Sequence, residues 1–311
     1  DTVLCMDPAN NAITVADASL TIGKEEGKWR VLDKKGELKD VTTLPVDENY
    51  MAYFKPFIDK ANAFANEKIG EFKHAIKTAD SYFGNSAFND LILNLELQIT
   101  NADIAFNAPL SFNSTINAGQ VYMSDMFKLY KYENQLYVMR LTGDEIRKHL
   151  EMSYDLWMNT MTSPDDHLLL LDNHTYGDAQ RMGFKNFSFN FDAAAGIDYT
   201  VDVTKPNGKK VKILQMSDGT PFDPKKWYKV AVNSYRANGG GELLTKGAGI
   251  PKDSLENRIV WRSERDQRYY LMQEIKRQGV LDPQPNHNWK VIPEEWTTPA
   301  AARDRKLLFG E

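Results

Sequence analysis

Two segments that lie far apart in the chain carry residue types suited to holding a flat ring. Residues 129–136 read LYKYENQL and place Tyr132 between an expected helix and an expected strand. Residues 233–241 read NSYRANGGG and place Tyr235 just after an expected buried strand. Two aromatic rings that face each other across a gap can hold a purine or pyrimidine, because every base offers a π-face for stacking. The pair is therefore a candidate base-binding sandwich.

The second segment ends in three consecutive glycines, Gly239, Gly240 and Gly241. Glycine has no β-carbon, so this run can bring the backbone close to a ligand. Both segments lie at the ends of regular elements, where loops often carry function. Tyrosines near loops are nevertheless usually part of an amphipathic surface, and residue types alone favour that plainer interpretation.

Residue patterns for a catalytic centre are absent from the sequence. The five histidines form no HxH or HExxH pair, and there is no GxSxG elbow and no GxxxxGK[ST] loop. His149 falls on an expected helix and is interpreted as an exposed or internally satisfied residue. Asp165, Asp166 and His167 form the nearest approach to a ligand cluster and are interpreted as a solvated loop. We therefore expect no catalytic residue and no metal ligand in this chain.

Composition indicates a soluble-type globular chain with an acidic balance. The 311 residues include 42% hydrophobic residues and carry a net charge of −5. A binder of polymeric nucleic acid would normally present a basic face, so such a partner is not expected. The single cysteine, Cys5, allows neither an internal disulfide nor a CxxC zinc site. No apolar run is long enough for a membrane span, no signal peptide is visible, and the start at Asp1 suggests a trimmed chain.

Periodicity and capping signals predict helices and strands in a mixed order. Helices are expected over residues 47–68, 85–99, 124–129, 142–158 and 266–278, the last followed by a proline-containing tail. Strands are expected over residues 12–16, 28–32, 69–72, 103–106, 135–141, 187–191, 199–203, 211–213 and 228–232. Thr142 and Glu145 have the spacing of a capping box, and Phe187, Phe189 and Phe191 alternate with polar residues as in a strand. The pattern predicts an α+β fold of mixed sheets with packed helices.

The first part of the chain differs from the rest. Its two short strands, followed by an expected turn at Asp33–Gly36, would be marginal alone. The segment resembles a closing hairpin that once packed on something else. We therefore expect two regions, 1–45 and 46–311.

Five motifs in a fixed order carry a family resemblance over nearly the whole chain. They are MSDMF with YENQL between 123 and 136, LTGDEI at 141–146, LEMS at 150–153, FD through GIDY and Asp202 from 191, and NSYRANGGG at 233–241. Together they resemble the C-terminal domain of the 5′-nucleotidase family, and most of all its branch of 2′,3′-cyclic-nucleotide 2′-phosphodiesterase/3′-nucleotidases.

The resemblance implies particular roles for matching positions. Tyr132 and Tyr235 would sandwich the base, Asn134 would hydrogen-bond its edge, and the backbone of the glycine run would lie beside the ribose. Arg236 is a further candidate within the second segment. Many members carry aspartate, which accepts from ribose hydroxyls, where this chain has Gly241. Free 2′- and 3′-hydroxyls would lose that partner, so the difference favours the branch that takes cyclic and 3′-nucleotides.

A second departure concerns residues 107–113, NAPLSFN, which stand where the family has an NGGGxR ligand segment. Asn107 and Asn113 are the candidate contacts there. The resemblance also implies that residues 1–45 end a metallophosphatase domain whose metal motifs have no counterpart here. A divalent metal pair in that missing N-terminal domain would cut the ester, this chain alone would be inactive, and the protein would be periplasmic, secreted or on the cell surface.

Two alternatives remain open. The chain could be a stand-alone module that captures nucleosides or nucleotides without catalysis, or a structural or adhesion domain whose tyrosines are only surface residues. A DxH…GNHD segment upstream of Asp1 would favour the enzyme over the stand-alone module. A structural domain would show no stacked pair of tyrosine rings.

Overall fold

The computed structural model describes residues 3–9, 11–176 and 179–310. It contains two compact units, Asp1–Asn62 and Ala63–Glu311, which divide within helix α1 (Glu48–Ala65). The boundary expected at residues 45 and 46 falls just before this helix.

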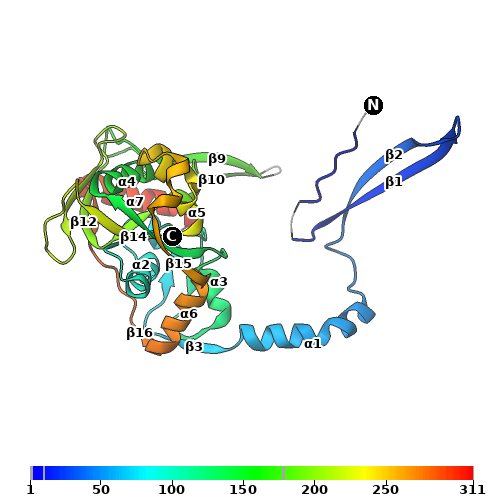
Figure 1. The fold of residues 1–311 in the computed structure, drawn as a ribbon, viewed down its shortest axis with the longest axis horizontal. Helices are drawn as coiled ribbons and strands as arrows, with labels where there is room; N and C mark the ends of the chain where they lie inside the picture. The colour runs from blue at the N-terminus through cyan, green and yellow to red at the C-terminus, as the bar shows by residue number, and fades with distance from the viewer. Residues whose placement is uncertain (1–2, 10, 177–178, 311) are drawn as a thin grey trace. The chain divides into compact units, whose positions relative to one another are not determined.

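The first unit is built on one antiparallel hairpin, β1 (Thr14–Glu25) and β2 (Lys28–Asp40) (Figure 1). The chain reverses at Glu26 and Gly27, which both have positive φ, as a tight two-residue hairpin turn requires. The turn expected at residues 33–36 is wrong, because these residues lie inside β2. Large apolar side chains such as Trp29 stay exposed, and no residue of α1 is buried.

The second unit is organised around a five-stranded mixed sheet. Its strands run in the order β11 (Ala193–Ala195), β5 (Ile104–Asn107), β14 (Trp227–Asn233), β8 (Gln135–Thr142) and β15 (Ile259–Asp266). Strand β14 is parallel to β5 and antiparallel to β8. The sheet thereby brings the end of β14 beside the start of β8.

Helices cover both faces of this sheet. On one face Ala105, Ala195 and Ala231 leave room for Leu93 of α2 (Ala87–Thr100). The other face carries larger residues, including Phe106, and packs into the main core with α4 (Gly143–Trp157). Alternating small and large side chains along the strands therefore set the two helix layers.

Further strands, helices and turns complete the second unit. The remaining strands are β3 (Lys68–Phe72), β4 (Ile76–Lys77), β6 (Thr115–Ile116), β7 (Gly119–Tyr122), β9 (Leu171–Tyr176), β10 (Ala179–Phe184), β12 (Ile197–Asp202), β13 (Val211–Met216), β16 (Val280–Leu281) and β17 (Trp289–Ile292). The remaining α-helices are α3 (Met126–Leu129), α5 (Ser234–Ala237), α6 (Gln267–Gln278) and α7 (Glu294–Phe309). Short 3₁₀ or π turns are η1 (Thr78–Tyr82), η2 (Met123–Asp125), η3 (Ser188–Asn190), η4 (Gly240–Glu242), η5 (Leu243–Gly247), η6 (Lys252–Ser254) and η7 (Glu256–Arg258).

Strands β9 and β10 pair as an antiparallel hairpin that extends from the body of the second unit (Figure 1). None of the helices in the described part of the chain is long and apolar enough to cross a membrane.

Several local predictions are confirmed. The α+β class is observed, Ser86 caps α2 by accepting from the N–H of Asn89, and Thr142 and Glu145 form both bonds of the capping box. Two others are wrong. Residues 187–191 contain the turn η3 rather than a strand, and the expected C-terminal tail forms α7 despite Pro299 within it.

Candidate functional site

Tyr132 and Tyr235 line one cleft of about 210 Å³, which we call the aromatic cleft. Its lining residues are Leu110, Tyr132, Asn134, Phe189, Asn233 and Tyr235. Each of the two tyrosines is 42% exposed, so both rings are accessible from solvent. Among the described residues, a ring contact joins Tyr235 to Phe189 and none joins it to Tyr132. The two tyrosine rings are therefore not packed on each other.

Strand pairing explains why distant segments meet here. Tyr132 and Asn134 lie in the turn between α3 and β8, and Tyr235 lies in α5 directly after β14. The antiparallel register pairs Asn233 with Leu136, which places the end of β14 beside the start of β8. The N–H of Gln135 also donates to the hydroxyl oxygen of Ser234 at 3.1 Å, which ties the two segments together directly.

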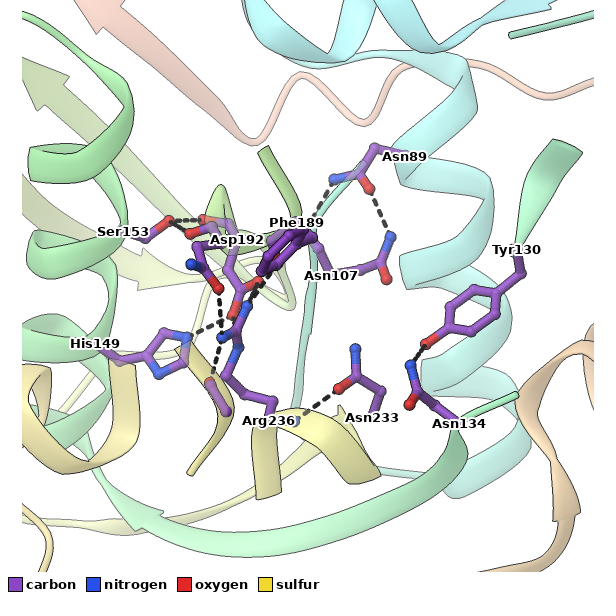
Figure 2. Close-up of polar contacts among 12 residues, drawn as sticks. Asn89, Asn107, Tyr130, Asn134, His149, Ser153, Phe189, Asp192, Asn233 and Arg236 are labelled. Atoms are coloured by element: carbon purple, nitrogen blue, oxygen red, sulfur yellow. Dashed lines mark hydrogen bonds and ion pairs between the residues drawn. The ribbon is translucent and has the colours of Figure 1, made fainter. Parts of the chain in front are cut away.

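The polar side of the cleft contains two asparagines with different partners (Figure 2). The amide of Asn134 donates to the hydroxyl of Tyr130 at 3.4 Å, and its oxygen makes no hydrogen bond within the described part of the chain. The oxygen of Asn233 accepts from the backbone N–H of Arg236 at 2.8 Å, as a helix cap does. Burial raises the pKa of Tyr130, so its phenol stays neutral. Asn134 thus lines the cleft and keeps a side-chain oxygen without a partner among the described residues.

Arg236 is an internal support of the cleft. Its side chain is buried, and all five N–H donors of its guanidinium have protein acceptors. Two form a bidentate pair with Asp192 at 2.9 Å each, two reach the side chain of Asn190 and the carbonyl of Gly240, and one reaches the carbonyl of Phe189 (Figure 2). The guanidinium therefore fixes both the η3 turn that carries Phe189 and the glycine loop.

A buried histidine completes this network. His149 lies in α4, is fully buried, and bonds Asp192 through Nε2 at 2.8 Å. Its ring stacks on Phe106 with centroids 4.3 Å apart, and its Nδ1 has no hydrogen-bond partner in the described residues. Burial lowers the pKa of His149 and outweighs the attraction of Asp192. For Asp192, burial alone would raise the pKa, but Arg236 and His149 together hold it below its usual range. The network is thus a neutral imidazole beside an ion pair.

The glycine loop packs against this support. Gly239 and Gly241 have φ values of 88° and 69°, which side-chain-bearing residues rarely adopt. A β-carbon on Gly240 would overlap the ring of Tyr235, and one on Gly241 would overlap the guanidinium of Arg236. In this structure the glycines allow close packing of the cleft's own residues.

Arg236 and the three glycines lie behind the cleft and are not among its lining residues, and the candidates Asn107 and Asn113 also lie outside it. Asn107 is buried in β5, where its amide donates to the side-chain oxygen of Asn89 at 2.7 Å. Asn113 is an exposed loop residue. The sequence reasoning in turn missed Phe189, which appeared only as part of an apparent strand, and Asn233, which stood unassigned in the second motif.

Asp166 and His167, for which a solvated loop is expected, differ in their contacts. Asp166 accepts from the backbone N–H of Thr162 at 2.7 Å, as in an ordinary turn. His167 instead contacts the buried carboxylate of Asp304. Across the described ranges, no three histidine, cysteine or acidic side chains gather in a group that could hold a metal ion.

Comparison with known proteins agrees with the observed fold. Residues 68–246 match the family described as 5′-nucleotidase, C-terminal domain. The chain belongs to this family.

Similar proteins include enzymes of nucleotide metabolism. The chain is 27% identical over 313 residues to the trifunctional nucleotide phosphoesterase protein YfkN of Bacillus subtilis, covering 89% of this chain and 20% of that protein. It is 24% identical over 329 residues to the 2′,3′-cyclic-nucleotide 2′-phosphodiesterase/3′-nucleotidase of Haemophilus influenzae, covering 92% and 47%. The fold is shared with a 5′-nucleotidase precursor of Thermus thermophilus, with a TM-score of 0.59, 20% identity, and coverage of 91% and 50%. The chain therefore spans less than half the length of these two curated relatives.

Proposed function

We propose that this chain binds the base and ribose of a 2′,3′-cyclic or 3′-nucleotide and positions its ester for hydrolysis by a separate metal-binding domain. The observation that carries the proposal is the convergence of Tyr132, Tyr235 and Asn134 on one accessible cleft. Stacking on aromatic side chains contributes about 1–3 kcal/mol per base and tolerates any base. The free oxygen of Asn134 adds an acceptor for an amino or imino group on the base edge.

Gly241 supports the cyclic- and 3′-nucleotide branch. A β-carbon at this position would overlap the side chains of Asn190 and Arg236, so an aspartate does not fit the loop as it is built. A carboxylate there would accept hydrogen bonds from free 2′- and 3′-hydroxyls of the ribose. A 2′,3′-cyclic phosphate has no such hydroxyls and is negative, so the missing carboxylate removes a repulsion.

The proposal divides labour between two domains. This chain holds the nucleoside far from the reacting phosphorus, and that binding energy orients the ester. A divalent metal pair in a preceding domain would activate water and stabilise charge on the phosphate. We accordingly expect the isolated chain to bind nucleotides without hydrolysing them. A location in the periplasm or on the cell surface remains a prediction of the family resemblance.

Calorimetric titration tests this function with 3′-AMP, 2′,3′-cyclic AMP and adenosine as ligands. Tyr132→Ala and Tyr235→Ala should each weaken binding by about 1–3 kcal/mol, which is roughly 5- to 150-fold. Tyr53→Ala is the matched control, because Tyr53 is 73% exposed on α1 in the other unit. Unchanged affinity in both cleft variants would refute the sandwich.

A separate assay tests the division of labour. The purified chain is incubated with 2′,3′-cyclic AMP in the presence of Mn²⁺, Co²⁺ or Zn²⁺. Turnover by the chain alone would contradict the two-domain account. Binding without turnover, together with no metallophosphatase segment in the parent gene, would favour the stand-alone module.

A further inference from the structure

A second cleft lies at the base of the β9–β10 hairpin, and we call it the hairpin cleft. It has a volume of about 660 Å³. Its lining residues are Phe112, His174, Arg181, Met182, Gly183, Phe184, Lys185, Asn186, Phe187 and Ser188. The function proposed above uses none of these residues.

One aromatic wall separates the two clefts. Phe187 lines the hairpin cleft and Phe189 lines the aromatic cleft, and their rings stack with centroids 5.1 Å apart and planes 9° apart. On a second segment, Leu110 lines the aromatic cleft and Phe112 lines the hairpin cleft. The two clefts are therefore neighbours, and a ligand longer than one nucleotide can extend from one into the other.

The floor of the hairpin cleft is a packed aromatic cluster. Phe184 lies 4.6 Å from Tyr82 and 5.5 Å from Phe112, measured between ring centroids, and Phe112 lies 5.0 Å from Phe309. The phenol of Tyr82 donates to the carbonyl of Ser111 at 2.9 Å. The floor is thus held by the core of the second unit. Phe187, by contrast, is 72% exposed and presents a free surface for stacking.

The charge of the hairpin cleft is positive. Arg181 and Lys185 are exposed cations, no ion pair is recorded for either in the part of the chain that the structure describes, and no acidic residue lines the cleft. The guanidinium carbon of Arg181 lies 5.9 Å from the centroid of the Phe112 ring, which preorients the cation over an aromatic face. Exposed aromatic rings beside unpaired cations match a ligand with flat bases and phosphate groups.

We propose that the hairpin cleft is a second subsite that takes the linking phosphate and the second nucleoside of a dinucleotide. The first base of that dinucleotide lies in the aromatic cleft, so this inference rests on the proposed function. The second base stacks on Phe187, and the linking phosphate lies within reach of Arg181 and Lys185. A nucleoside without phosphate fills the aromatic cleft alone.

Calorimetry on the full chain tests the subsite with four probes: adenosine, 3′-AMP, the phosphodiester-linked dinucleotide ApA, and diadenosine pyrophosphate. We expect at least one dinucleotide to bind roughly 5- to 150-fold more tightly than 3′-AMP, as one additional stacked base predicts. The two dinucleotides show which linkage the subsite prefers. Phe187→Ser should reduce that gain. Arg181→Gln/Lys185→Gln should weaken 3′-AMP and both dinucleotides, because the linking phosphate of ApA is the 3′-phosphate of its first nucleoside, and should leave the adenosine affinity unchanged. Lys225→Gln, which changes an exposed lysine elsewhere, should change none of these affinities.

The outcomes separate the two proposals. Equal affinity for 3′-AMP and both dinucleotides, with 3′-AMP binding still lost in Tyr132→Ala, overturns the subsite alone. Equal weakening of every probe by the hairpin-cleft variants also overturns it. Absence of any Tyr132-dependent binding overturns both proposals. A gain that persists in Phe187→Ser would show that the second nucleoside lies elsewhere, and this result overturns the subsite.

Discussion

Replacing Arg236 with methionine should destabilise the second unit strongly. The change removes five hydrogen bonds and leaves the carboxylate of Asp192 buried without its cation. Breaking a buried ion pair on one side costs about 3–5 kcal/mol, because the remaining charge is neither solvated nor paired. Urea unfolding followed by circular dichroism, with the slope checked for two-state behaviour, measures this loss.

Two companion variants separate the ion pair from general damage. Arg236→Met/Asp192→Leu removes both charges and should recover part of the lost stability relative to Arg236→Met. Lys246→Met breaks the exposed pair with Glu242 and should leave the unfolding free energy almost unchanged. A loss below about 1 kcal/mol in Arg236→Met would refute the reasoning, and so would a double variant less stable than the single one.

Three further predictions follow from the buried groups and the glycine loop. His149→Gln should flatten the fall in stability as the pH drops below about 6.5, since a histidine with a lowered pKa takes up protons only on unfolding; the melting temperature between pH 5 and pH 8 measures this. Burial raises the pKa of the Glu96 carboxyl, so wild-type stability falls as the pH rises above about 4.5, and Glu96→Gln should flatten this fall. The same thermal series checks it, and an unchanged slope of melting temperature against pH contradicts it. Gly240→Ala should weaken nucleotide binding several-fold with little change in melting temperature, because a β-carbon displaces the ring of Tyr235; equal calorimetric affinity would exclude this.

Local signals in the sequence predicted local structure well. The Thr142–Glu145 capping box and the Ser86 cap depend on neighbouring residues only, and both are present. The alternation of phenylalanines at 187–191 predicted a strand wrongly, because the three rings have three different surroundings. Phe191 is buried in the core, Phe189 lines the cleft and Phe187 is exposed, so the three rings do not mark one face of a sheet.

The site was predictable only in part. The two tyrosine segments could be identified from their composition and motifs, and the pairing of β14 with β8 brings them together. The positions of Leu110 and Phe189 depend on tertiary packing that no local pattern encodes. The role of Arg236 likewise depends on Asp192, which lies 44 residues away in the chain. A sequence motif could identify the arginine but not the acceptors that occupy all its donors.

A crystal structure of the chain soaked with 3′-AMP or 2′,3′-cyclic AMP tests the central claim most directly. The account predicts the adenine ring between the side chains of Tyr132 and Tyr235, with an edge of the base in hydrogen-bond contact with Asn134. Electron density for the base at any other place, with the two tyrosine rings uncovered, would contradict it.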